Sequence, residues 1–155
     1  MESNIDPDEA RSTLAFLDDD GARLAERVVT PWWYHPILAA IVAAIIISQA
    51  LPGAWGITLL PLAIIAIPLL MLAYKKHSGV ATTQPAGPRS KRLMLMLMAV
   101  VVLALVSTLV VKLTDSSPWW ALIPAAIAAV ATVLLGRRYD AVLRQELALP
   151  VSARR

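Results

Sequence analysis

The chain has 155 residues, about the length of one domain, but its composition is not that of a soluble domain. Hydrophobic residues make up 58% and charged residues 16%, against roughly 45–50% and 25% in soluble proteins. These figures exclude a disordered chain and favour an integral membrane protein. The chain has no cysteine, which excludes disulfides, thiolate metal sites and a cysteine nucleophile.

Residues 1–30 are predicted to form a cytoplasmic segment that contains an amphipathic helix. Asp6, followed by proline, has the sequence of a helix N-cap. Beyond it, Leu14, Leu17 and Leu24 belong to an apolar stripe of helical spacing, with acidic residues on the opposite face. We expect this stripe either to pack against the protein's own cytoplasmic helix ends or to dock a partner protein.

Charge-free stretches predict the membrane spans. The stretch 28–74 has no formal charge. It is too long for a single membrane span, which needs about 20 residues. It is broken at Pro52 and Gly53, which suit the two central positions of a type II turn. We therefore predict an all-α, four-helix transmembrane bundle over residues 31–136, with spans at about 32–51, 55–74, 93–113 and 118–136.

The distribution of lysine and arginine predicts the orientation. The N-terminal segment, the loop 75–92 and the tail 137–155 together hold 13 of the 14 basic residues. The two short hairpin turns hold only Lys112. Because basic loops remain in the cytoplasm, we predict a multi-pass protein of the cytoplasmic (inner) membrane with both termini in the cytoplasm.

Two of these cytoplasmic segments have further features. The loop 75–92 is rich in Gly, Pro, Ser and Thr and is expected to be a flexible linker. The tail 137–155 is expected to extend the last helix until just before Pro150, with an Asp140–Arg144 pair one turn apart. The basic residues of the loop are candidates for contacts with lipid phosphates or an acidic partner; they are Lys75, Lys76, Arg89, Lys91 and Arg92.

Aromatic residues mark the beginnings of the first and fourth spans. Amphipathic aromatic rings settle at the headgroup level of a bilayer. Trp32, Trp33 and Tyr34 precede the first apolar run, and Trp119 and Trp120 precede the fourth. We predict that all five are membrane-interface anchors.

Few other residues are candidates for a function. His35 has no acid or second histidine nearby in sequence, so an interfacial hydrogen bond is favoured over a pH sensor or ligand site. Pro61 and Pro68 lie on one face of the second span and indicate a kinked packing face more than a substrate pathway. The sequence has no phosphate-loop, hydrolase or zinc motif. We therefore predict no enzyme activity, catalytic residue, cofactor, metal or nucleic-acid partner.

Two short stretches carry a resemblance to a known family. Arg27–Pro36 (RVVTPWWYHP) and Tyr74–Val80 (YKKHSGV) resemble a family of small uncharacterised four-span actinobacterial membrane proteins, and the likeness covers the first half best. That family has no established activity, so the resemblance implies an architecture and no site. The size and span number also resemble small multidrug exporters. Those depend on a membrane-embedded glutamate in the first helix, and the span 32–51 contains no acid.

Two functions remain after these exclusions. The favoured one is a non-catalytic accessory or scaffolding subunit of a membrane complex, whose N-terminal helix meets a partner. The alternative is a small oligomeric transporter or channel component for an apolar or uncharged substrate. Either function places the chain in the lipid bilayer, in contact with another membrane protein or with further copies of itself.

Overall fold

The computed structural model describes residues 30–78 and 85–149, together with isolated positions nearer the N-terminus. Within these ranges every regular element is a helix, which confirms the predicted all-α class. The predicted docking stripe of Leu14, Leu17 and Leu24 lies outside the described residues. In chain order the elements are α2 (Tyr34–Ala50), α3 (Ala54–Ser78), α4 (Pro88–Leu113), a 3₁₀ turn η1 (Pro118–Ala121) and α5 (Leu122–Ala148).

Three of the described helices are long and apolar enough to cross a membrane: Ala54–His77, Pro88–Leu113 and Pro118–Ala148. The fourth, α2, is a shorter apolar helix of 17 residues. It ends early because Leu51 precedes a proline and has an extended backbone, with φ −71° and ψ 134°. Gly53 then has a φ of +63°, which agrees with the positive φ at the second central position of a type II turn.

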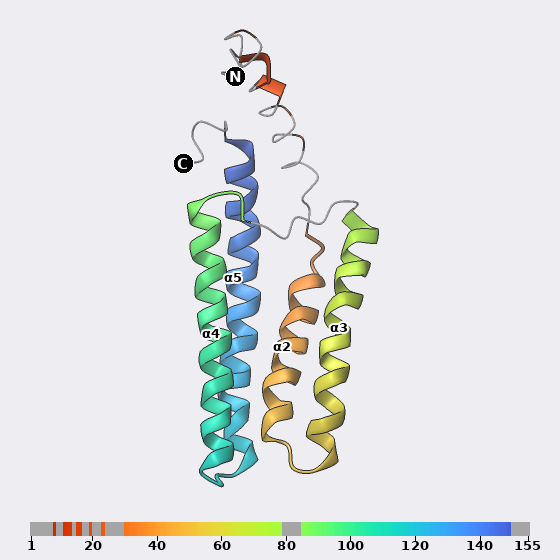
Figure 1. Ribbon diagram of the computed structural model, residues 1–155, viewed down its shortest axis with the longest axis vertical. Helices are drawn as coiled ribbons and strands as arrows, with labels where there is room; N and C mark the ends of the chain where they lie inside the picture. The colour runs from red at the N-terminus through yellow and green to blue at the C-terminus, as the bar shows by residue number, and fades with distance from the viewer. Residues whose placement is uncertain are drawn as a thin grey trace, which may run out of the picture.

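The helices form two antiparallel hairpins, α2–α3 and α4–α5, that lie side by side (Figure 1). The central helix is α2, which packs on α3, α4 and α5. In contrast, α3 packs on α2 and makes no comparable contact with α4 or α5. The hairpins are therefore joined mainly through α2.

Small residues allow the helices to approach closely. Ile46 of α2 is fully buried among Ala104, Ala125 and Ala128 of α4 and α5. A second cluster joins Ile41 of α2 to α3. Alanine-rich contacts of this kind are typical of helix packing in membranes, where close backbone approach replaces the hydrophobic effect as the driving force.

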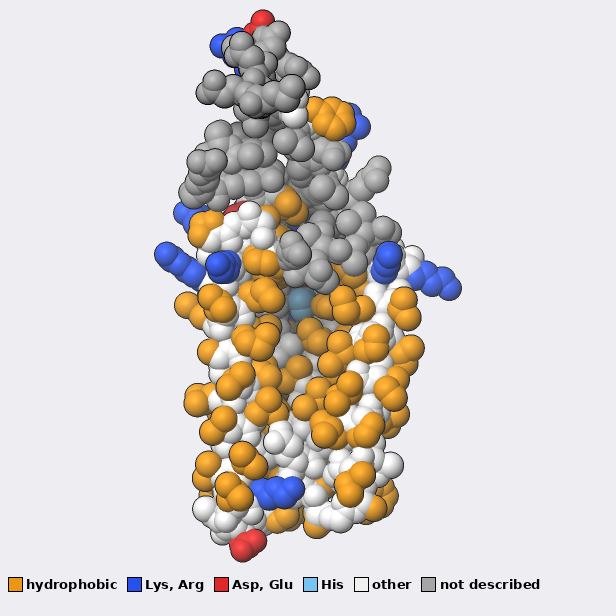
Figure 2. Space-filling model, viewed as in Figure 1, with side chains coloured by type: hydrophobic (Ala, Val, Ile, Leu, Met, Phe, Trp, Pro, Cys, Tyr) orange, Lys and Arg blue, Asp and Glu red, His pale blue; other side chains and the backbone are white. Residues whose placement is uncertain are grey.

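The predicted basic residues lie on helix ends and not in a flexible loop, because α3 continues to Ser78 and α4 begins at Pro88. Pro88 suits the first helical position of α4 because an N–H at that position would have no partner inside the helix, so nothing is lost by its absence. Figure 2 shows Lys and Arg side chains gathered at this end of the bundle. We call the end that contains the start of α4 and the ends of α3 and α5 the basic end.

Candidate functional site

A histidine–carboxylate pair joins the two hairpins at the basic end. His35 Nε2, in the first turn of α2, lies 2.7 Å from Asp140 Oδ2 on α5, and the two side chains are 7% and 14% exposed. The predicted Asp140–Arg144 pair is absent from the part of the chain described, because Asp140 turns towards His35 instead. The hydrogen bond expected for His35 is present, although its ring is buried between helices and its partner lies on α5; its interfacial depth stays a prediction. The partners are 105 positions apart, so local sequence gave no sign of the pair.

Gly136 makes this approach possible. A Cβ at position 136 would lie only 2.5 Å from His35 Nδ1 and 2.7 Å from His35 Cε1. The imidazole therefore packs directly on the backbone of α5. Within the described ranges, Nδ1 is the one buried side-chain polar atom that has no hydrogen-bond partner.

A second carboxylate connects α5 to the beginning of α4. Glu146, only 5% exposed, accepts hydrogen bonds from the Arg89 N–H (2.8 Å) and the Ser90 N–H (3.2 Å). These belong to the first turn of α4, where backbone N–H groups have no partner inside the helix. The N-cap residue is Gly87, which has no side chain to offer. Glu146 therefore caps α4 from a neighbouring helix, a role that the sequence analysis missed.

The same contacts set the charge of Glu146. Burial alone would raise the pKa of this carboxyl group. Hydrogen bonds from the Ser90 side chain and from the Arg89 and Ser90 N–H groups outweigh burial and hold the pKa below its usual value. Glu146 lies beyond the fourth predicted span, 118–136, and the lowered pKa keeps its carboxylate charged at neutral pH.

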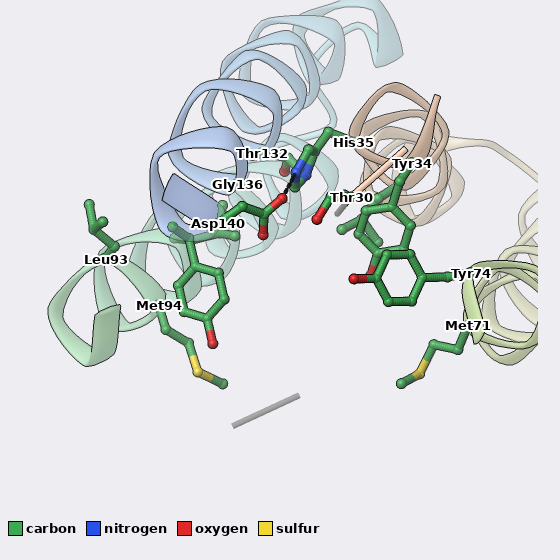
Figure 3. Close-up of a pocket in the computed structure, with 13 residues that line it drawn as sticks. Thr30, Tyr34, His35, Met71, Tyr74, Leu93, Met94, Thr132, Gly136 and Asp140 are labelled. Carbon is green, nitrogen blue, oxygen red and sulfur yellow. Dashed lines mark hydrogen bonds and ion pairs between the residues drawn. The ribbon is translucent and has the colours of Figure 1, made fainter. Parts of the chain in front are cut away.

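A cavity of about 220 Å³ lies beside the His35–Asp140 pair, between α3 and α4. Figure 3 shows His35 and Asp140 on its inner wall, with Met71 of α3 and Met94 of α4 facing each other across its outer edge. Leucine and tyrosine side chains supply most of the remaining wall, together with Thr30, Thr132 and Gly136. An apolar chamber with a few polar groups is the usual form of a site for a small ligand.

Aromatic contacts attach the end of α3 to the start of α2. The rings of Tyr34 and Tyr74 are 4.9 Å apart, and those of Trp33 and His77 are 6.2 Å apart and edge to face. Two of the five predicted anchors therefore also hold helices together. The other three, Trp32, Trp119 and Trp120, are 80%, 76% and 60% exposed, and their role as anchors stays a prediction.

The predicted basic contacts are all available to a ligand. Lys75, Lys76, Arg89, Lys91 and Arg92 are exposed, and their side chains form no ion pair with an acid in the described ranges. Those ranges also contain no group of three or more His, Cys, Asp or Glu residues that could hold a metal ion. The site therefore combines a mainly apolar cavity, a buried polar pair and exposed cations.

No protein-family model, curated protein or solved structure matches this chain. The resemblance of the stretches 27–36 and 74–80 to small actinobacterial membrane proteins stays a prediction. The site must therefore be interpreted from its own residues.

Replacing Gly136 with Ala is expected to destabilise the protein by about 1–3 kcal/mol, because the new methyl group overlaps the His35 ring. The measurement is thermal unfolding of the purified protein in detergent. The same substitution in a His35→Ala background should cost much less, since the ring it meets is gone. An equal loss in both backgrounds would contradict the close packing of His35 on Gly136.

Replacing Glu146 with Gln is expected to cost about 1–2 kcal/mol at pH 7, the usual loss when a helix cap is removed. A carboxyl with a lowered pKa contributes stability above its unfolded pKa of about 4.3 and loses it as the pH falls through the folded pKa. The difference between wild type and variant should therefore shrink below about pH 4.3. Unfolding curves at several pH values measure this, and Gln145→Ala, at an exposed neighbour, serves as the control. A difference independent of pH would contradict a charged cap.

Proposed function

We propose that this chain is a four-span protein of the cytoplasmic membrane, with both termini in the cytoplasm, that works as a non-catalytic accessory or scaffolding subunit. Basic helix ends on one side and the Lys112–Asp115 turn on the other support the orientation. With its 17 residues, α2 is at the lower limit of the roughly 17–25 residues that cross a bilayer. The flanking Trp32 and Trp33 supply interfacial rings next to it.

The subunit role is inferred from one exposed face of α3. We call it the outer face of α3 and define it as Pro61, Ile65, Pro68 and Leu72. All four side chains are exposed, and α3 packs on α2 alone among its neighbours. Each proline lacks an N–H, so the carbonyl four residues earlier loses its helical hydrogen bond. Such carbonyls are costly next to lipid and need a polar partner. A transmembrane helix of another subunit, packed on this face with a polar side chain, satisfies the requirement.

A non-catalytic role agrees with how the buried polar groups are used. His35 and Asp140 bond to each other across two helices, and Glu146 bonds to the backbone of α4. Each group therefore already has a structural partner. These bonds hold the bundle together and leave Asp140 and Glu146 committed to helix–helix contacts.

The alternative, a small transporter or channel component, is favoured by the cavity beside His35. The residues that line this cavity lie towards the basic end of α2, α3 and α4 and along the middle part of α5. The hollow at the opposite end is a separate one, between α4 and α5, near Trp120 and Ile127. A route across the membrane would have to join the two, so we rank the transport function second.

The orientation predicts which sites an impermeant thiol reagent reaches in intact cells. Because the chain has no cysteine, single substitutions report cleanly. Ser116→Cys, in the turn between α4 and η1, should be labelled from outside, whereas Gln145→Cys, near the end of α5, should be labelled only after the cells are opened. The reverse pattern would overturn the topology.

The subunit role predicts a neighbour at the outer face of α3. Ile65→Cys and Leu72→Cys should each form a discrete cross-linked product in native membranes treated with a bismaleimide, at a mass above 16.7 kDa. Mass spectrometry of the product separates a second copy of this chain from a different protein. Either product supports a subunit.

The matched control is Leu103→Cys, an equally exposed position on α4. It should give little cross-linking, because it is expected to face lipid. Equal cross-linking at all three positions would indicate random collision, and no product at position 65 or 72 would contradict the proposed docking face.

A further inference from the structure

The cavity beside His35 can hold only part of a ligand. Its volume of about 220 Å³ is below the roughly 300–1,000 Å³ of pockets that enclose a whole drug-sized molecule. Its outer edge is formed by Met71 and Met94, each 40% exposed and drawn from helices that make no substantial contact with each other. If the helices span a bilayer as proposed above, this edge faces the lipid. The rest of a ligand would therefore extend into the membrane.

Two cations lie beside this outer edge, one on each helix. Lys75 follows Met71 by four residues, and Lys91 precedes Met94 by three, so each lysine is on the same helix face as its methionine, one turn nearer the basic end. Figure 2 shows basic side chains on both sides of the upper part of the cleft, over α3 and α4. Both lysines are exposed and form no ion pair with a described acid.

The cavity and its cations suit different parts of one molecule. The wall of the cavity is mainly apolar and suits a hydrocarbon chain, whereas a pair of lysines attracts a phosphate and gives no partner to such a chain. A ligand that uses both must have an anionic headgroup on an apolar chain. The two requirements meet in an anionic phospholipid, which the cytoplasmic leaflet supplies.

We propose that the cavity between α3 and α4 binds one anionic phospholipid, with its phosphate at Lys75 and Lys91 and the upper part of one acyl chain between Met71 and Met94. The methionines suit this position because their flexible, polarisable side chains adapt to an irregular chain. The remaining acyl chain lies along the membrane-facing cleft. The site depends on the proposed membrane orientation but does not require a partner at the outer face of α3. Met71 lies about 100° around the helix from Leu72, whereas Lys75, seven residues after Pro68, borders both sites.

The neighbouring basic residues supply a matched control. Lys76 and Arg92 have the same charge and lie at the same helix ends, but each is one position further along its helix, about 100° around the axis and away from the methionine edge. The double variants Lys75→Gln/Lys91→Gln and Lys76→Gln/Arg92→Gln remove equal charge. Only the first removes the proposed phosphate contacts.

The test titrates purified full-length protein in a neutral detergent with phosphatidylglycerol, and separately with phosphatidylcholine of the same acyl chains. Native mass spectrometry counts the bound lipids, and thermal unfolding reports stabilisation. We expect one retained phosphatidylglycerol per chain. In Lys75→Gln/Lys91→Gln the apparent affinity should fall by about tenfold, because two exposed charge-assisted contacts are lost, while Lys76→Gln/Arg92→Gln should bind as wild type does.

A third variant tests the acyl-chain part of the site. Met94→Trp fills the outer edge of the cavity while both lysines remain, and it should also weaken phosphatidylglycerol binding. Because Met94 is 40% exposed, the larger ring is tolerated by the fold, which circular dichroism checks. Soluble glycerol phosphate should not stabilise the protein.

Several results would overturn the proposal. Equal weakening by the two lysine and arginine double variants would indicate attraction to the basic end in general. Equal binding of phosphatidylcholine would remove the role of charge, and stabilisation by glycerol phosphate would indicate a phosphate site without an acyl chain. None of these results depends on cross-linking at α3, so failure of the lipid site and failure of the subunit role are distinguishable.

Discussion

The hydrogen bond between His35 and Asp140 ties α2, the helix through which the two hairpins mainly meet, to α5. Both side chains are nearly buried, and removing one partner of a buried hydrogen bond typically costs about 1–3 kcal/mol. The bond requires the imidazole to rest on the α5 backbone, which only the absent side chain of Gly136 permits. The position of α2 against α5, and therefore the inner wall of the cavity, depends on these three residues.

Polar contacts between helices are concentrated at the basic end. Glu146 caps the first turn of α4 there, and the paired aromatic rings of Tyr34 and Tyr74 hold α3 to α2. Further from this end the helices rely on alanine contacts around Ile46. Because α3 is held by α2 alone, a space remains between α3 and α4, and the cavity lies in it. The two proposals use adjoining faces of α3, one for a neighbouring helix and one for a lipid, and Lys75 lies where they meet.

The sequence predicted the helices well because their limits have local causes. Long apolar stretches require helices in a membrane, and prolines and glycines mark where they stop. Interactions that come from another helix leave no such local sign. The i,i+4 spacing predicted Arg144 as the partner of Asp140, and the absence of a nearby acid left His35 without a predicted partner. The ring contact of Trp33 with His77 was likewise not predicted.

By itself, the sequence determined the all-helical class, the turn at Gly53 and the grouping of cations at the same ends of the helices, since composition and backbone chemistry act over a few residues. Only the tertiary structure decided that His35 meets Asp140, that Glu146 caps α4, and that Met71 and Met94 lie on either side of one cavity. These pairings join residues on different helices. They depend on which faces pack together, and that choice is made by close packing of small residues over the whole bundle, for which no local pattern exists.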